Sequence, residues 1–249
     1  MKHTNFVKVF GLLTLATGMA LTGFGSALAV TFTPPGNESP RQTTGGASRS
    51  GQLCGQASSP FASTQEAVTP LLPSSNSGMT QLDRPTILVY LPETGEKEAM
   101  FSIKDEGKQL HYQMNVPISG EAGLVAIQLP EDAPALEVGK NYQWFFALKC
   151  DGKLHPSNPL VSGWIERSPS NSESAFSPSS NPDELLQEAI ALGNSGIWYD
   201  TVATLARLRT MQPDNSQVST HWNELLASVG LDVLTTTPLA DSPESAESN

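Results

Sequence analysis

The sequence predicts a mainly β protein, an antiparallel β-sandwich that is followed by a small α-helical appendage. Short runs rich in Val, Ile, Tyr, Phe and Trp recur about every ten residues within 54–167, and Gly, Pro and acidic residues separate them. The pattern then changes, because the apolar residues of 182–234 recur with the period of a helix. Residues 168–181, which are almost wholly Ser, Pro and Asn, are predicted to be a linker between the two regions.

The N-terminus has the pattern of a secretory signal peptide. Lys2 and Lys8 precede an apolar stretch, and the small residues Ala27 and Ala29 suit a signal peptidase. We expect cleavage after Ala29, which removes residues 1–29 and leaves a periplasmic or secreted protein. A membrane anchor is the alternative, but the apolar stretch is short for a span and is interrupted by Thr and Gly. No second long apolar run follows, so we expect no membrane span in the mature chain.

Two further segments are predicted to lie outside the folded regions. Residues 30–53 are dominated by Thr, Ser, Gly and Pro and cannot bury enough apolar area to offset their ordering entropy, so we expect a flexible leader. Residues 235–249 are polar and acidic, and we expect a disordered tail there.

The chain has 2 cysteines, Cys54 and Cys150. In an oxidising compartment two cysteines pair more often than they work separately, so we expect one disulfide. It would close a loop of roughly a hundred residues. A redox-active pair is the alternative, but such pairs are usually built as Cys-x-x-Cys, and these two lie far apart in the sequence.

Six strands are predicted in the sandwich. They are expected at 86–91, 98–103, 109–116, 124–129, 141–150 and 160–166. The alternating apolar residues of the third strand are expected to share one face, namely Leu110, Tyr112, Met114 and Val116. The centre of the fifth strand is apolar on both faces, which is typical of a strand in the middle of a covered sheet.

One local pattern defines the kind of sandwich. Leu136, Gly139 and Tyr142 have the spacing Leu-x-x-Gly-x-x-Tyr of the tyrosine corner, in which the Tyr hydroxyl bonds back to the upstream backbone. This motif is found in immunoglobulin-like and fibronectin-type sandwiches, and its role is structural. We therefore expect an immunoglobulin-like sandwich.

Three helices are predicted after the linker, at about 182–193, 197–212 and 216–229. The first begins with Asn181 as N-cap, Pro182 at the first helical position and Glu184 as part of a capping box.

These helices resemble one degenerate tetratricopeptide repeat followed by a capping helix. Over 182–215, Gly196, Trp198, Leu205 and Pro213 fall where that repeat places its turn glycine, aromatic, packing residue and closing proline. A single repeat cannot bury its own face. The alternative is a small helical hairpin that packs on the sandwich or on a partner.

A family resemblance covers about residues 50–230. Its most distinctive piece is Gly-Trp-Ile-Glu-Arg at 163–167, with support from Arg84-Pro85-Thr86 and from Gly196-Ile197-Trp198. These stretches resemble the cyanobacterial DUF928 family, a domain of unknown function. The resemblance implies a secreted cyanobacterial protein, and it carries no catalytic residue that could be transferred to this chain.

Charge and motifs exclude several function classes. With 25 Asp and Glu against 14 Lys and Arg the net charge is −11, the wrong sign for nucleic-acid binding. The histidines beyond the signal peptide, His111, His155 and His221, have no metal-ligand spacing, and no nucleophile or phosphate-binding motif is present. We therefore expect no catalytic residue, no metal site and no cofactor, and a protein that is not an enzyme.

The best candidate for a binding surface is the end of the sixth predicted strand. If Val161, Gly163 and Ile165 face inward, Trp164 faces outward beside Glu166 and Arg167. The alternative is that Trp164 packs under the helices and forms a seam between the two regions.

The sequence thus leads to two hypotheses of function. The first is a non-enzymatic interaction or adaptor protein of the envelope, whose partner is unknown. The second is a glycan- or cell-wall-binding sandwich that uses exposed aromatic residues such as Trp164 or Tyr90.

Overall fold

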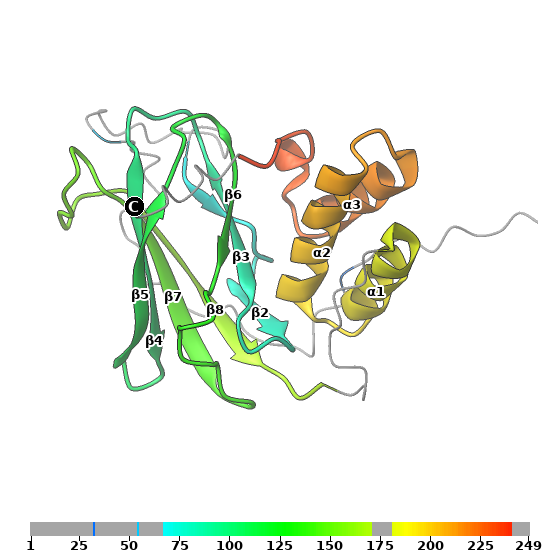
Figure 1. Ribbon diagram of the computed structural model, residues 1–249, viewed down its shortest axis with the longest axis horizontal. Helices are drawn as coiled ribbons and strands as arrows, with labels where there is room; N and C mark the ends of the chain where they lie inside the picture. Colours follow the sequence, from blue (N-terminus) through cyan, green and yellow to red (C-terminus); the bar gives the residue numbers. More distant parts are fainter. Residues whose placement is uncertain (1–31, 33–53, 55–66, 171–180, 241–249) are drawn as a thin grey trace, which may run out of the picture.

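The computed structural model describes Phe32, Cys54 and residues 67–170 and 181–240. These residues form three layers, a five-stranded sheet, a three-stranded sheet and a group of three helices (Figure 1). The mainly β fold with a C-terminal helical appendage, which the sequence predicts, is therefore confirmed. The predicted signal peptide and, apart from Phe32, the predicted leader lie outside the described residues.

The five-stranded sheet has the order β2-β8-β7-β4-β5. Its strands are β2 (Ser77–Thr80), β4 (Glu98–Asp105), β5 (Leu110–Pro117), β7 (Asn141–Leu148) and β8 (Leu160–Arg167). All neighbours run antiparallel except β2, which pairs parallel with β8. This strand departs from the wholly antiparallel arrangement that the sequence predicts. Its four residues, Ser-Gly-Met-Thr, carry no apolar alternation by which it could be recognised.

The three-stranded sheet has the order β1-β3-β6 and is antiparallel. Its strands are β1 (Thr69–Pro70), β3 (Thr86–Leu91) and β6 (Gly123–Gln128). From Ile87 to Leu91 every residue of β3 is buried, because one face meets the sandwich core and the other meets the helices.

The chain after the helices returns to the edge of β6. The backbone N–H of Leu124 donates to the carbonyl of Pro238 at 2.8 Å, and the N–H of Ala240 donates to the carbonyl of Leu124 at 2.9 Å. The prediction of a disordered tail from residue 235 is therefore wrong for 235–240, which satisfy backbone groups of an edge strand. Residues 241–249 of the predicted tail lie outside the described residues.

The core between the sheets is built from large aromatic side chains. Trp144 and Phe101 are buried and stack with their ring centroids 6.3 Å apart. Gly163 of β8 makes room for them, since a Cβ at this position would lie 2.7 Å from Trp144 and 2.3 Å from Leu72. The glycine of the Gly-Trp-Ile-Glu-Arg stretch is therefore required by packing.

The Tyr142 side chain closes a turn ahead of β7. Its hydroxyl accepts a hydrogen bond from the backbone N–H of Glu137 at 3.1 Å, five residues upstream. Leu136 and Tyr142 are buried, and Gly139 has a φ of +77°, which favours glycine. This is the arrangement of a tyrosine corner.

A β-bulge changes the face on which one residue of β5 lies. The register between β4 and β5 shifts after Ile103, so that Lys104 lies opposite Leu110. Tyr112, Met114 and Val116 pack toward the core as predicted, but Leu110 points outward and is 58% exposed. The prediction that all four share one face is wrong for Leu110.

The helices are α1 (Pro182–Asn194), α2 (Trp198–Met211) and α3 (Ser216–Ser228), followed by a short 3₁₀ turn, η3 (Asp232–Leu234). Asparagine side chains cap α1 and α3. The side chain of Asn181 accepts from the N–H of Asp183, and that of Asn215 accepts from the N–H groups of Gln217 and Val218.

The start of α2 anchors the helices to the sandwich. Trp198 is fully buried, and its Nε1 donates to the carbonyl of Leu71 at 2.8 Å. The hydroxyl of the buried Tyr199 accepts from Nε1 of Trp144 at 2.6 Å and donates to the carbonyl of Trp164 at 2.9 Å. The helices are thus an integral layer of the fold that packs on the sandwich.

Candidate functional site: the outer face of the five-stranded sheet

The outer face of the five-stranded sheet is the face that carries neither the core nor the helices. Side chains alternate along β7, so that Trp144 and Phe146 point inward while Gln143 and Phe145 point outward and are less enclosed. The pairing of the strands then fixes rows of neighbours. Trp164 lies opposite Gln143, which lies opposite Lys104, and Phe145 lies opposite Ser102.

These outward side chains line a groove of about 750 Å³. It is lined by Met100, Ser102, Lys104, Asp105, Glu106, Lys108, Leu110, Gln113, Gln143, Phe145, Ala147, Leu154, Leu160 and Trp164. The two aromatic rings come from adjacent strands, and amide and hydroxyl groups lie between and beside them. Two large apolar side chains of the lining, Leu110 and Leu154, are 58% and 47% exposed. The groove therefore combines apolar surfaces with a few polar groups, as ligand sites commonly do.

One of the two lysines that line the groove, Lys104, lies over an aromatic ring. Nζ of Lys104 is 5.4 Å from the centroid of Phe145, which is a cation–π contact. Lys104 forms no ion pair with a described residue. Its ammonium group therefore contributes a positive charge to the groove.

The two carboxylates that line the groove, those of Asp105 and Glu106, already accept hydrogen bonds within the chain. Oδ1 of Asp105 accepts from the N–H of Gln109 at 2.8 Å, and Oε1 of Glu106 accepts from the side-chain amide of Asn141 at 2.8 Å. These bonds shape the turn between β4 and β5.

Only one of the three residues in the predicted binding surface lines the groove. The ring of Trp164 lies in the groove and is half-buried, while its carbonyl meets Tyr199 of α2. Trp164 therefore takes part in both arrangements that the sequence offers as alternatives. It lines the groove, and its backbone carbonyl contacts the helices. Glu166 lies farther along β8, opposite Asn141. Arg167 donates from Nη1 to the carbonyl of Leu136 at 2.6 Å and so supports the tyrosine corner.

The second exposed aromatic residue proposed from the sequence is buried. Tyr90 lies on β3 and is only 6% exposed, because β3 is covered on both sides. The expectation that Tyr90 faces a ligand is wrong.

Sequence reasoning missed Phe145, Lys104 and the amide of Gln143. The centre of β7 is apolar on both faces, a pattern that is typical of a covered strand and predicts one here. In the structure the outward residues of β7 form the floor of the groove instead. The signal that could have identified Phe145 is its alternation with the inward residues of β7, which places its ring on the same face as Gln143.

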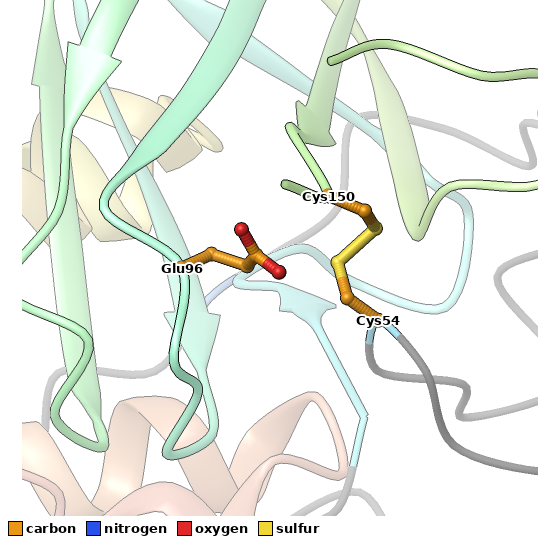
Figure 2. A group of neighbouring side chains, drawn as sticks. All are labelled: Cys54, Glu96 and Cys150. Atoms are coloured by element: carbon orange, nitrogen blue, oxygen red, sulfur yellow. A yellow bond between two sulfur atoms is a disulfide. The ribbon is translucent and has the colours of Figure 1, made fainter. Parts of the chain in front are cut away.

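The two cysteines form a disulfide with their Cα atoms 5.4 Å apart, as the sequence predicts (Figure 2). It joins Cys54 to the chain after β7, across 96 residues of sequence. Glu96 points toward this disulfide, and its carboxylate accepts from the N–H of Asp151 at 3.1 Å. Ligand-type atoms of Cys54, Glu96 and Cys150 lie within 4.8 Å of one another. A disulfide sulfur is not a thiolate, so in this state the three residues do not offer a metal the donors it needs.

Comparison of the sequence with models of known protein families identifies one family. The sequence profile of DUF928, described as Domain of Unknown Function, matches residues 44–239, most of the chain. The chain belongs to the DUF928 family. No curated protein matches it in sequence. In the described part of this DUF928 chain, none of the helices has the length and apolar character to cross a membrane.

A buried carboxylate joins the helices of this DUF928 chain to the five-stranded sheet. Asp200, in the first turn of α2, is 1% exposed. Its carboxylate accepts hydrogen bonds from the hydroxyl of Thr80 and, at 2.8 Å, from the N–H of Gln81. Burial raises the pKa of Asp200 to about 6, and the charge of Glu188 also raises it, although both hydrogen bonds act in the opposite direction. Asp200 lies away from the groove and belongs to the attachment of the helices.

Proposed function

We propose that this chain is a secreted or periplasmic, non-enzymatic binding protein, and that the sheet groove binds a glycan of the cell envelope. The observation that carries the proposal is the placement of Phe145 and Trp164 in one groove, on adjacent strands, beside Lys104 and Gln143. Aromatic faces stack on the C–H faces of sugar rings, and amide and ammonium groups bind sugar hydroxyls. Together they suit an extended, polar polymer with flat apolar faces.

The proposed location is supported by two features. The first 29 residues have the pattern of a signal peptide. The disulfide between Cys54 and Cys150 is the kind of bond that persists in oxidising compartments. The resemblance to a cyanobacterial family points to the polysaccharides of a cyanobacterial envelope as the ligands to test first.

The chemistry of the groove supports binding over catalysis. Its polar groups include the ammonium of Lys104, the amides of Gln113 and Gln143 and the hydroxyl of Ser102. Acid–base catalysis on sugars commonly needs two carboxyl groups that flank the bond to be cleaved. The carboxylates that line the groove, those of Asp105 and Glu106, are adjacent in sequence and accept hydrogen bonds that hold the turn.

A second candidate is a protein partner, as in an adaptor of the envelope. The exposed side chains of Leu110 and Leu154 in the lining of the groove favour it, because exposed leucines are typical of protein contacts. The helices do not support a separate peptide-binding surface of the tetratricopeptide kind, since their aromatic residues Trp198 and Tyr199 are already buried on the sandwich.

The test is a binding assay of the mature chain, residues 30–249, against envelope polysaccharides and cell-wall fragments. Phe145→Ala is expected to weaken glycan binding about tenfold, the loss of about 1.4 kcal/mol of stacking. Met211→Ala is the matched control, because Met211 is exposed on α2, outside the groove, and this variant is expected to bind normally.

Two results would contradict the glycan proposal. One is the absence of binding to every polysaccharide by a folded chain. The other is equal binding by wild type and Phe145→Ala. Capture of an envelope protein that is lost with Leu110→Ser and Leu154→Ser, with no glycan binding, would establish the adaptor function instead.

A further inference from the structure

The strand β5 has a free edge that lacks the usual protection against pairing. It is the last strand of the five-stranded sheet, and no described strand pairs with its outer side. Its eight residues, Leu-His-Tyr-Gln-Met-Asn-Val-Pro, include no Asp, Glu, Lys or Arg, although the whole chain carries a net charge of −11. Charged side chains on an edge strand are a common device that keeps two sheets apart. Their absence over a whole strand favours pairing.

The ladder of the sheet shows which backbone groups point outward. The N–H of Ile118 donates to the carbonyl of Lys97 at 3.0 Å. In an antiparallel pair, bonded and non-bonded positions alternate, so Tyr112, Met114 and Val116 bond to β4. The N–H and C=O groups of Gln113 and Asn115 therefore point away from the sheet. Both residues are exposed.

We propose that β5 pairs with β5 of a second copy of this chain, antiparallel and about a two-fold axis at Met114. In this register Gln113 lies opposite Asn115 of the other copy, and each such pair exchanges two backbone hydrogen bonds. The two side-chain amides also face each other, and an amide both donates and accepts. Two five-stranded sheets then become one continuous sheet of ten strands.

The second copy is favoured over a foreign strand because the edge is complementary to itself. The same two residues, Gln113 and Asn115, supply the donors and the acceptors on each side, which is what a two-fold interface requires. Two acidic chains also meet here along a strand that carries no formal charge of its own, with Asp132 near its residue Tyr112. Pro117 lacks an N–H, but it lies at the end of the strand, opposite His111, and leaves both central pairs intact.

The pairing would place two grooves on one face. Gln113 and Leu110 of β5 line the groove, so the grooves of both copies would lie next to the new strand pair. A polymer that reaches both grooves would bind more tightly than to one copy, through a higher effective concentration.

The first test is the oligomeric state of the mature chain by analytical ultracentrifugation over a range of concentrations. A monomer–dimer equilibrium is expected. Asn115→Pro removes an outward N–H that bonds to nothing within the sheet, so it is expected to give a folded monomer. Asn115→Ala keeps the N–H and is expected to remain dimeric. A monomer at every concentration, or a dimer that Asn115→Pro leaves unchanged, would overturn the proposal.

The second test fixes the register. Met114→Cys would place two thiols opposite each other at a non-hydrogen-bonded pair, where Cβ atoms lie about 4.5–5.5 Å apart, and is expected to form a disulfide-linked dimer under mild oxidation. Asn115→Cys is the control and is expected to cross-link poorly, because Asn115 faces Gln113. The reverse pattern on a non-reducing gel would exclude this register. Pairing of the edge only with a strand of another protein would exclude the second copy as its partner.

Discussion

The outer faces of the two sheets differ, because the helices cover one of them and leave the other open. The outer face of the three-stranded sheet is covered by the helices, and β3 is buried on both sides. The outer face of the five-stranded sheet carries Phe145 and Trp164 but leaves a groove of about 750 Å³. Both faces carry large apolar side chains, so the presence of such side chains does not by itself distinguish a face that packs within the chain from one that stays open. The difference lies in α2, which packs against β3 of the three-stranded sheet.

The largest loss of stability is expected from removing Trp198, the main anchor of the helices. Trp198→Ala deletes a fully buried side chain that packs on the sandwich and on Phe32, whose ring lies 4.9 Å away. The free energy of unfolding is expected to fall by about 3–5 kcal/mol, as for other buried aromatic residues. Urea denaturation followed by circular dichroism measures it. A loss below about 1 kcal/mol would mean that the helices contribute little to the fold.

The next effect concerns pH. The pKa of Asp200 is about 6 in the folded chain and lies near 4 when the chain unfolds, so between these values the folded chain holds a proton that the unfolded chain releases. The contribution of Asp200 to stability is therefore fully present below about pH 4 and is lost as the pH rises to about 6. Over that window it amounts to about 3 kcal/mol.

Asp200→Asn removes the titratable group. Comparing this variant with wild type therefore separates the contribution of Asp200 from those of all other carboxylates. The difference in unfolding free energy between wild type and Asp200→Asn is expected to change in favour of the variant as the pH rises from about 4 to about 6. Denaturation curves of both proteins at several pH values give this difference. A difference that is constant with pH would show that Asp200 keeps an ordinary pKa.

A smaller effect is expected from the hydroxyl that links the two regions. Tyr199→Phe removes the acceptor of the Trp144 Nε1 hydrogen and leaves a buried donor without a partner. A loss of about 1–3 kcal/mol is expected. Thermal unfolding compares this variant with Tyr112→Phe, a control that removes a hydroxyl from a half-buried tyrosine of β5. Equal losses in the two variants would contradict a special role for the bond between Tyr199 and Trp144.

The smallest change in stability is expected on the open face. Phe145→Ala removes a half-buried ring and is expected to cost about 1 kcal/mol, well below the cost of Trp198→Ala. The same denaturation experiment measures it. A loss as large as that of Trp198→Ala would show that Phe145 is part of the core and would weaken the case for a binding site.

The sequence predicted much of the fold because its regular elements have strong local patterns. Positions 86–91 form β3 as expected, and Asn181 caps α1. The strands β1 and β2 were missed because two and four residues are too few to show alternation. The bulge after Ile103 was missed because it depends on pairing with β4, and it moved Leu110 to the outer face.

The candidate site was only partly predictable for a related reason. Trp164 was found because it stands among polar residues, whereas Phe145 lies in a run that is apolar on both sides. The same kind of run in β3 is covered by α2, and this led to the wrong expectation for Tyr90. The placement of the helices depends on contacts such as that of Asp200 with Thr80, between residues 120 positions apart in the sequence.

A nuclear magnetic resonance titration of residues 30–249 with soluble envelope polysaccharide decides whether the outer face of the five-stranded sheet binds a ligand. We expect saturable shifts for Phe145, Lys104 and Gln143 and none for residues of the buried strand β3, such as Tyr90. Shifts that cluster on the helices, or no shifts at saturating polysaccharide, would contradict this expectation.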